Sequence, residues 1–479
     1  MTSRPPAQNP QPTSLWHASL RGTTVGSLVL VLLSAFEAMA VTTVMQTVAD
    51  DLDGQALYSV AFSATLAASV IAMVVSGRWS DRSGPVGPLL TAVGFFLAGL
   101  IVAGTAINMP ILVVGRFLQG LGGGAITVTL YVVVARRYPP ALHPKVFGMF
   151  SAAWVVPSMI GPFLAGVISD YVSWHWVFLG VAIFVLPALL LLVPSLKAVR
   201  GPAPGSEEPL EDDADIDANQ KVRTGVAVSL SVVVAVGLVI AGSFAEAQPG
   251  PIVWAGALAI FLVVAMAARK LLPTGTLRVR RGLPATILMR GTMAAAYFGT
   301  EVYLPKMLQS EYHMSASMAG LVLTVGAVSW SVGSAIQARL DQRVKTERLL
   351  VLGAAIVATA IAVQLVSALA SLGPIVAMLG WLIGGMGMGL SFPRVSTSML
   401  AFSTPHDQGF NSAALSISDS IGGATATAVT GLVFVAVGSG LGAFAACFGF
   451  CLGIAVFNIF VATRAGGAPG RVSATDIVG

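Results

Sequence analysis

Long apolar runs, separated by short polar or charged loops, alternate along the chain from residue 24 to residue 462. Each run has about the 20 residues that an α-helix needs to cross the hydrocarbon core of a bilayer. The runs occupy residues 24–46, 55–76, 86–107, 110–134, 146–168, 172–194, 224–244, 251–271, 284–305, 316–338, 349–371, 375–399, 409–434 and 440–462. We therefore predict an all-α polytopic membrane protein with fourteen transmembrane helices. A twelve-helix alternative would require the two runs within 224–271 not to span, although each is long and apolar enough to cross.

Polar segments divide these helices into groups. Residues 1–23 are polar and proline-rich, which predicts a disordered cytoplasmic tail, and residues 195–223 carry seven acids between Glu207 and Asp217, which is typical of a solvated cytoplasmic linker. The other predicted units are an N-terminal six-helix bundle at 24–194, two linker helices at 224–271, a basic cytoplasmic connector at 272–283, a C-terminal six-helix bundle at 284–462 and a cytoplasmic tail at 463–479. This order predicts an internal repeat of two six-helix bundles.

Composition and charge agree with a membrane protein. Hydrophobic residues make up 56% of the chain and charged residues only 10%, whereas a soluble domain carries about 25% charged residues. The net charge of +5 does not indicate a nucleic-acid partner, because the basic residues lie in short loops. With both termini in the cytoplasm, all 26 Lys and Arg residues fall on the cytoplasmic side except Lys306, which lies outside, and Arg116, Arg290 and Arg394, which lie within helices. The positive-inside rule therefore predicts this orientation. We expect a protein of the plasma or bacterial inner membrane, and we expect it to be monomeric.

Arg116 interrupts the apolar run 110–134 well inside the predicted membrane. An arginine at that depth costs about 2.5–3.5 kcal/mol or more, so it normally faces a carboxylate or a polar cavity rather than lipid. Gln119, Gly123 and Thr127 follow it at helical spacings and draw a polar and small-residue stripe along one face. This stripe suits a cavity wall or a close helix contact. The alternative for Arg116 is that its long side chain reaches the membrane surface.

Three acids lie within predicted helices: Glu37, Glu301 and Asp419. Burial disfavours the charged form of a carboxylate, and a nearby arginine such as Arg116 or Arg394 restores it, so such acids can bind and release protons as their surroundings change. The spacing of the neighbouring polar residues predicts two cavity-lining stripes, one made of Arg290, Tyr297 and Glu301 and the other of Ser412, Ser416 and Asp419. Two alternatives stay open, because Arg290 is near enough to the cytoplasmic end to reach the surface and Glu301 is near the outer boundary.

Two predicted cytoplasmic loops, one in each bundle, show the sequence similarity expected of an internal repeat. The loop after the second run reads GRWSDRSGP from Gly77, and the corresponding loop of the second bundle reads QARLDQRVK from Gln337, so Asp81 matches Asp341. A short turn of mixed charge can pair with a helix end in one conformation and release it in another. We expect a gating role, although a loop that only sets membrane topology is the simpler alternative.

The run 146–168 contains Pro157 and the pair Gly161-Pro162. Proline removes a backbone hydrogen bond and glycine removes a side chain, so we predict a kink where a neighbouring backbone approaches closely. The alternative is that glycine and proline are common in membrane helices.

These residues together resemble the major facilitator superfamily and, within it, the fourteen-helix drug:proton antiporters. Four groups of positions carry the resemblance: the loop positions Gly77, Asp81, Arg82 and Gly84; the helix positions Leu112, Arg116, Gln119 and Gly120; the antiporter-type helix positions Gly148, Gly161, Pro162 and Gly166; and Glu37, where that group usually has an aspartate. Some positions depart from the family pattern, namely Pro85 and Val86 in the loop, Pro157 in place of a glycine and Gln46 in place of a proline. The resemblance implies a major facilitator fold with two six-helix bundles and two linker helices.

The resemblance also implies a proton-coupled antiporter that exports small lipophilic or drug-like compounds by alternating access, with the proton gradient as its driving force and no cofactor. Export of an endogenous lipid, siderophore or metabolite is an alternative, and a membrane sensor or scaffold without transport is another. We do not expect an enzyme, because the chain contains no HExxH pair and no GxSxG turn. Nor do we expect a metal site, because Cys447 and Cys451 have no histidine nearby in the sequence.

Overall fold

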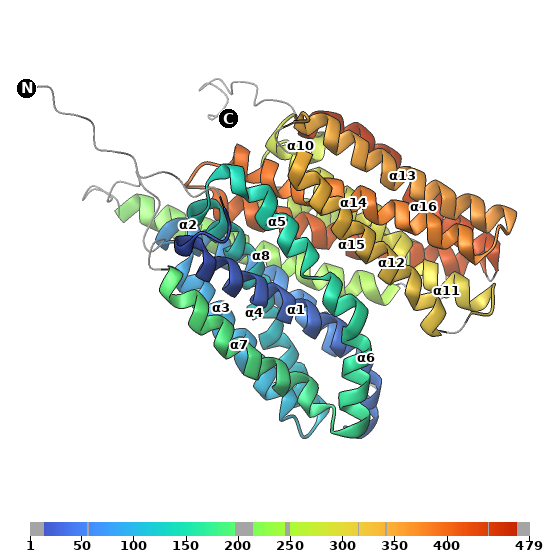
Figure 1. The fold of residues 1–479 in the computed structure, drawn as a ribbon, viewed down its shortest axis with the longest axis horizontal. Helices are drawn as coiled ribbons and strands as arrows, with labels where there is room; N and C mark the ends of the chain where they lie inside the picture. Colours follow the sequence, from blue (N-terminus) through green and yellow to red (C-terminus); the bar gives the residue numbers. More distant parts are fainter. Residues whose placement is uncertain are drawn as a thin grey trace, which may run out of the picture.

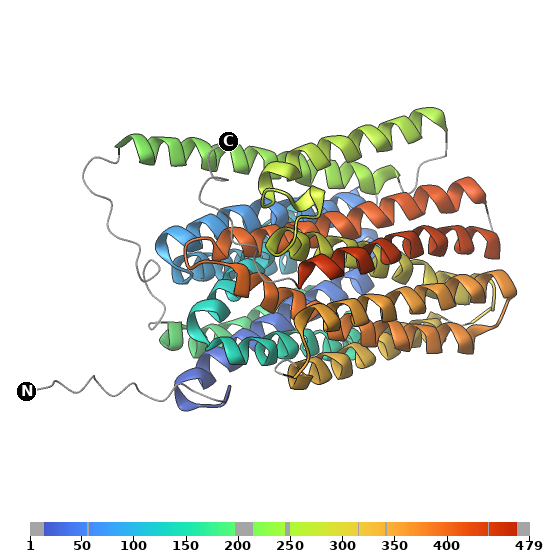
Figure 2. The ribbon, with the colours of Figure 1, turned by 90° about the horizontal axis from the view of Figure 1, so that it is seen from above.

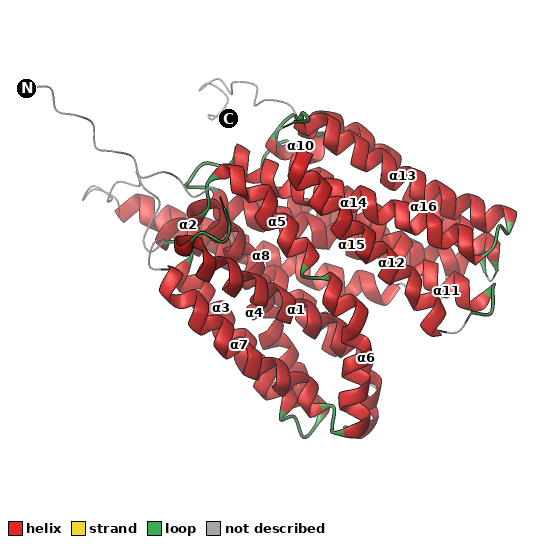
Figure 3. Cartoon of the chain, in the orientation of Figure 1, coloured by secondary structure: helices red, strands yellow, loops and turns green. Residues whose placement is uncertain are grey.

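In the described part of the chain, every regular element is a helix, and loops and turns join the helices (Figure 3). The computed structural model describes residues 14–54, 57–196, 214–244, 250–314, 316–340, 343–438 and 440–466. The helices are α1 (Ala18–Asp51), α2 (Tyr58–Ser83), α3 (Val86–Gly104), α4 (Met109–Arg137), α5 (His143–Ala152), α6 (Val155–Tyr171), α7 (His175–Ser195), α8 (Ala214–Phe244), α9 (Pro251–Leu271), α10 (Leu283–Glu301), α11 (Tyr303–Ser310), α12 (Ala316–Leu340), α13 (Thr346–Ala370), α14 (Pro374–Phe402), α15 (Gln408–Val437) and α16 (Leu441–Ala465). Two short 3₁₀ turns, η2 (Pro140–Leu142) and η4 (Thr276–Arg278), precede α5 and α10.

The predicted count of fourteen spans is not reproduced in full. Among the described residues, eleven helices are long and apolar enough to cross a membrane, or twelve when α5 and α6 are taken as one bent span. The two remaining predicted spans are α8, whose apolar part Thr224–Ile240 is shorter, and α10, which carries Arg290 and ends at Glu301. Both helices are present, but neither is apolar over a full membrane thickness within the described residues.

Two predicted polar segments are partly helical. Residues 18–23, placed in the tail by the sequence pattern, belong to α1, and α8 begins at Ala214 within the predicted linker. The sequence explains the second difference, because residues 214–224 contain no glycine or proline and place acids in the first turn, where the helix dipole favours them. Residues 1–13 and 197–213, the rest of the predicted tail and linker, lie outside the described residues.

The helices form two groups (Figure 1). Helices α1–α7 pack with one another as the first half, and α10–α16 pack as the second half, which agrees with the predicted pair of bundles. Within the first half, α4 lies between α2 and α3 and packs closely against both, because glycines replace side chains at the contacts. A Cβ at Gly115 would lie 2.6 Å from the backbone nitrogen of Ala103 on α3, and a Cβ at Gly120 would overlap the carbonyl oxygen of Thr65 on α2. Such small residues at helix contacts are the usual means of close packing in membranes.

The two halves meet at one end of the molecule. We call the end where α1 begins and α16 ends the base, and the opposite end the far end. Near the base, α2 and α4 contact α15, and α5 contacts α12. Gly77 shows how close this contact is, since a Cβ there would lie 2.5 Å from the carbonyl oxygen of Gly409. From this contact the ribbons of the two halves diverge toward the far end (Figure 1).

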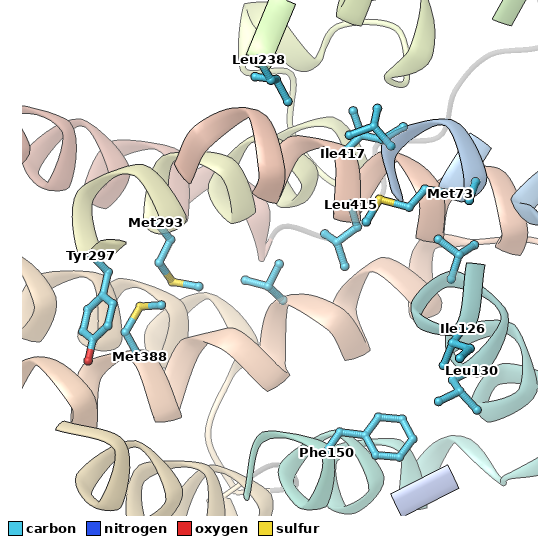
Figure 4. Packing of buried hydrophobic residues seen from close by; sticks show 14 of the residues in the cluster. Met73, Ile126, Leu130, Phe150, Leu238, Met293, Tyr297, Met388, Leu415 and Ile417 are labelled. Carbon is cyan, nitrogen blue, oxygen red and sulfur yellow. The ribbon is translucent and has the colours of Figure 1, made fainter. Parts of the chain in front are cut away.

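Buried apolar side chains from both halves form one continuous core (Figure 4). In the close-up, Met293 of α10 and Met388 of α14 point toward each other within the second half. The labelled residues of this core also include Met73, Ile126, Leu130, Phe150, Leu238, Tyr297, Leu415 and Ile417. Because lipid tails are as apolar as these side chains, dispersion contacts rather than water exclusion stabilise such packing in a membrane.

Helices α8 and α9 form a hairpin on one side of the two halves (Figure 2). Helix α8 packs against α2 of the first half and α15 of the second half. Near the base, Arg78 Nη1 of α2 donates a hydrogen bond to the hydroxyl of Thr224 on α8, at 3.3 Å. The hairpin therefore covers the seam between α2 and α15.

The predicted kink is present in the span formed by α5 and α6. The segments Pro140–Ser158 and Phe163–Tyr171 are bent by 43° relative to each other, and Gly161-Pro162 lies between them. The predicted close approach of a neighbouring backbone to Gly161 is not seen among the described residues. The atoms nearest to a Cβ built on this glycine belong to side chains of α1, with the Cβ of Met39 at 3.5 Å and the ring of Phe36 at 3.7 Å. The bend therefore lies where α6 packs against α1 in the first half.

Candidate functional site

Arg116 of α4 pairs with Glu37 of α1. The side chains are almost completely buried, with 6% and 8% of their surfaces exposed. Arg116 Nη1 donates to Glu37 Oε1 and also to the side-chain oxygen of Gln119, at 2.9 Å, one turn further along α4. The spacing of three places Gln119 on the same helix face, so it holds the arginine from its own helix while α1 supplies the acid.

The face that carries Arg116 continues into open space. Outside its own stretch of helix, no described atom lies within 4 Å of a Cβ built on Gly123, and Thr127, one turn later, is exposed. The neighbouring Gly120 and Gly124 instead meet the backbone of α2. One face of α4 is therefore a packing surface, whereas the predicted stripe runs from a buried ion pair to an accessible wall.

A second ion pair joins α10 and α15 in the second half. Arg290 Nε donates to Asp419 Oδ1 at 2.8 Å, and Nη1 donates to the carbonyl oxygen of Phe392 at 3.3 Å and to the Ser396 hydroxyl at 3.1 Å. The guanidinium carbon also lies 3.2 Å from the centroid of the Phe392 ring. Arg290 is 5% exposed, so the alternative in which it reaches the surface is wrong.

The two acids of these pairs differ in exposure. The Asp419 side chain keeps 27% of its surface exposed, although its arginine is buried. Ser412 and Ser416, which precede Asp419 on α15, are buried. In the predicted stripe Ser412, Ser416 and Asp419 on α15, the two serines are therefore buried and Asp419 is accessible.

Arg394 lies on α14 and contacts the start of α13. Its Nη2 donates to the hydroxyl of Thr346, the first residue of that helix. Arg394 is 8% exposed. The structure therefore places it beside a polar partner within the second half.

Tyr297 and Glu301 occupy the far part of α10. Tyr297 is 1% exposed and stacks on Trp381 with ring centroids 4.4 Å apart, so it lies inside the second half rather than on an accessible wall. Glu301 is the last residue of α10 and is partly buried.

Asp81 connects the two halves at the base. Its carboxylate accepts hydrogen bonds from the backbone N–H groups of Gly409 and Phe410, the latter at 2.8 Å, in the first turn of α15. An acid at this position satisfies N–H groups that have no partner within the helix and interacts favourably with the helix dipole. The loop can turn after α2 because Gly84 adopts φ 84°, a conformation that suits glycine. Arg82 is exposed, and the matching Asp341 lies outside the described residues.

The predicted antiporter-type positions have different surroundings. Gly148 of α5 faces the second half, since a Cβ there would lie 3.6 Å from the carbonyl oxygen of Ser334 on α12. Pro157 is buried in α6, Pro162 lies in the bend, and Gly166 has open space beside it. Gly148 therefore lies at the contact between the halves.

Comparison with known families identifies the architecture. The family model described as Major Facilitator Superfamily matches residues 27–427. The chain belongs to the major facilitator superfamily. Members of this superfamily are transporters, so this protein is a multi-pass membrane transporter rather than an enzyme.

Curated relatives within the superfamily carry efflux names. Multidrug resistance protein 3 of Bacillus subtilis is 28% identical over 338 residues, which cover 68% of this chain and 62% of that protein. The chain therefore spans just under two thirds of that relative's length. A probable multidrug-efflux transporter of Mycobacterium tuberculosis is 26% identical over 409 residues, which cover 83% of this chain and 84% of that protein.

Solved structures of the superfamily share the fold at low sequence identity. The human organic anion transporter MFSD10 aligns with a TM-score of 0.66 at 14% identity, over 92% of this chain and 99% of that one. A bacterial homologue of the iron transporter ferroportin, solved in an outward-facing state, aligns with a TM-score of 0.65 at 11% identity, over 92% and 98%. Identities this low establish the major facilitator fold and no more.

Sequence reasoning did not find several residues of the site in this superfamily member. Phe392 and Ser396 accept hydrogen bonds from Arg290, Thr346 accepts one from Arg394, and the backbone N–H of Gly409 donates one to Asp81. A ring or hydroxyl in an apolar run gives no signal of its own, because only the neighbouring helix shows what it contacts. Gly409 alone carried a sequence signal, since it opens an apolar run just after the polar turn at 404–408.

Proposed function

We propose that this transporter is a proton-coupled antiporter that exports small lipophilic or drug-like compounds across the cytoplasmic membrane by alternating access. The observation that carries the proposal is the presence, in each half, of a carboxylate paired with a buried arginine: Glu37 with Arg116 and Asp419 with Arg290. Charged pairs within apolar helices are costly and are retained where they serve ion or proton movement.

The pairs give the carboxylates two states. While the arginine is paired, the ionised carboxylate is favoured; when the arginine is withdrawn or engaged elsewhere, the protonated carboxylate is favoured, because an isolated charge is poorly solvated. A substrate or a helix movement that separates the pair therefore makes the acid take up a proton. Restoring the pair releases that proton, which is the exchange that antiport requires.

The contact between the halves supports the alternating-access part of the proposal. In the present arrangement, the base is held closed by α2, α4 and α5 against α12 and α15, with Asp81 at the first turn of α15. Opening the base breaks these contacts and allows the far ends to approach. The names of the bacterial relatives support the drug-like substrate class.

The proposed orientation places the base in the cytoplasm, because the positive charges gather in the loops at that end. A protease added to right-side-out cells is then expected to leave the segment 195–223 intact. The same protease is expected to cut that segment in inside-out vesicles. Cleavage in intact cells would reverse the orientation.

The proposal is tested with the full-length protein in proteoliposomes under an imposed pH gradient. We expect uphill movement of a lipophilic fluorescent compound, together with proton flux in the opposite direction and loss of both when an uncoupler is added. Binding without movement would instead support a membrane sensor. Movement that is restricted to one endogenous lipid, siderophore or metabolite would replace the drug-like substrate class, and movement insensitive to the gradient would remove proton coupling.

A further inference from the structure

Three aromatic rings from different helices form one surface in the second half. Phe298 of α10 and Trp330 of α12 are stacked, with centroids 6.5 Å apart and planes at 27°, and Trp330 meets the edge of Phe392 of α14 at 5.1 Å. All three side chains are only half-buried, although each packs against the hydrophobic core. We call Phe298, Trp330 and Phe392 the aromatic ledge.

The ledge faces the first half. Phe298 lies between α12 and α15, because it stacks on Trp330 on one side and lies 3.8 Å from a Cβ built on Gly423 on the other. Helices α12, α14 and α15 of the second half contact the first half: α12 contacts α5 and α6, α14 contacts α5, and α15 contacts α2 and α4. A surface lying between α12 and α15 is therefore directed toward the first half, whose α4 has open space beside Gly123.

The rings of the ledge are held from behind. Tyr297 is buried, meets Trp330 edge-on at 5.5 Å and is itself stacked on the buried Trp381. Phe392 is held by the Arg290 guanidinium at 3.2 Å from its centroid. A binding surface that is already ordered loses little conformational freedom when a ligand binds.

We infer that the aromatic ledge is a substrate subsite that binds a flat aromatic group by stacking, next to the Asp419–Arg290 pair. This inference rests on the proposed function and specifies the substrate class for which the second half is built. Flat rings gain offset-stacked or edge-to-face contact with Phe and Trp beyond the area that they bury, whereas a saturated ring of similar size gains only the burial. A ring bound on the ledge also places the rest of the substrate beside Asp419. Substrate binding is thereby coupled to separation of the Asp419–Arg290 ion pair.

The test is equilibrium binding of matched probes to the purified full-length protein in nanodiscs at fixed pH, without a gradient. Each pair consists of a naphthalene compound and its fully saturated decahydro counterpart, both linked to the same head group. Three pairs are used, with a neutral hydroxymethyl, a trimethylammonium or a carboxylate head group, so that the charge of the substrate need not be assumed. We expect the wild type to bind the aromatic member of at least one pair about threefold to tenfold more tightly than the saturated member. Trp330→Leu is expected to abolish this preference, Phe298→Leu to reduce it, and Trp330→Phe to retain most of it.

Trp254→Leu is the matched control, because Trp254 lies 40% exposed on α9 of the hairpin, away from the ledge. It is expected to keep the wild-type preference, and unchanged binding of the saturated probe by the ledge variants shows that they are folded. The inference is overturned if the wild type shows no aromatic preference, or if Trp330→Leu retains it. Failure of the proposed function is separate: a protein with a ledge-dependent aromatic preference but no gradient-driven movement keeps the subsite and loses the antiport.

Discussion

The two ion pairs hold their acids differently. Glu37 and Arg116 are both almost fully enclosed, and the arginine has only one further described partner, Gln119 of its own helix. Arg290 is instead held by a carbonyl, a hydroxyl and an aromatic ring in addition to Asp419, whose side chain is 27% exposed. The first pair is therefore closed, and its arginine depends on its acid, whereas the second has a fixed arginine and an accessible acid.

Under the proposed function, we expect this difference to give the two acids different tasks. An accessible carboxylate can exchange a proton with water in the present conformation, while an enclosed one must first lose its partner or its cover. The energetic cost of losing an acid also differs, because an arginine with other partners tolerates the loss better than one without. We therefore expect Asp419 to exchange protons directly and Glu37 to couple protonation to helix movement.

The largest expected effect is that of neutralising either acid. Asp419→Asn and Glu37→Gln are each expected to abolish substrate accumulation against an imposed pH gradient while folded protein remains in the membrane. Only Glu37→Gln is expected to lower the free energy of unfolding strongly, by about 3–5 kcal/mol, because it leaves Arg116 as a buried, uncompensated charge. Transport assays and thermal unfolding of the purified variants check both parts.

The double variant Glu37→Gln with Arg116→Gln is the control for this prediction. It removes both charges, so stability should recover while accumulation stays lost. Full coupled transport in both single variants would show that neither acid carries the proton, and equal stability losses would erase the difference between the pairs.

Replacing Arg116 isolates the role of the enclosed pair. Arg116→Ala removes the buried partner of Glu37, so helix movement is no longer coupled to the making and breaking of this pair; substrate binding should stay measurable, but accumulation should fall by more than about tenfold. Arg116→Lys retains the charge but replaces the planar guanidinium, whose Nη1 donates to both Glu37 and Gln119, with a flexible ammonium, so partial rescue is expected. Accumulation against a pH gradient is compared with binding at fixed pH, and wild-type accumulation by Arg116→Ala would make the arginine purely structural.

Two pairs of glycines, one on α4 and one on α15, test whether the helix faces beside the two ion pairs border open space. Gly120→Ala and Gly422→Ala place a methyl group onto the carbonyls of Thr65 and Gly291, and are each expected to destabilise the protein by about 1–3 kcal/mol. Gly123→Ala and Gly423→Ala are expected to stay within about 0.5 kcal/mol of wild type, because no described neighbour outside the same stretch of helix lies within 3.5 Å of the added atom. Thermal unfolding of the four variants is the measurement. A loss at Gly123 as large as that at Gly120 would mean that the α4 stripe is a packing surface.

The smallest expected effect concerns Asp81, the carboxylate that joins the halves rather than belonging to one of them. Asp81→Ala removes the acceptor for the first turn of α15 and should weaken the closed base by about 0.5–2 kcal/mol. A cysteine introduced at the buried Ser334 on α12 should then be labelled about two- to thirtyfold faster. Ser83→Ala, an exposed neighbour, is the control, and unchanged labelling in Asp81→Ala would show that the contact does not hold the base.

The sequence predicted the class of fold because membrane helices are encoded locally. A run of about 20 apolar residues must become a helix in lipid, since every backbone polar group needs an internal partner. The two bundles, the bend at Gly161-Pro162 and the unusual positions of Arg116, Glu37 and Asp419 therefore followed from residue type and spacing. The same reasoning predicted more spans than length and composition support within the described residues, where α10 carries the charged Arg290 and the apolar part of α8 is short.

The sequence by itself determined which residues are too costly to be placed in lipid without a purpose, and only the tertiary structure decided what they contact. Helical spacing put Gln119 beside Arg116, but Glu37 reaches Arg116 because α1 packs near α4, and Asp419 reaches Arg290 because α15 packs on α10. The aromatic ledge left no signal in three apolar runs, since a phenylalanine facing lipid and one facing a substrate look alike along the chain. The free-energy cost of placing a charged residue in lipid follows from that residue and its immediate neighbours in sequence. Which side chain it contacts depends on how helices far apart in the chain are packed.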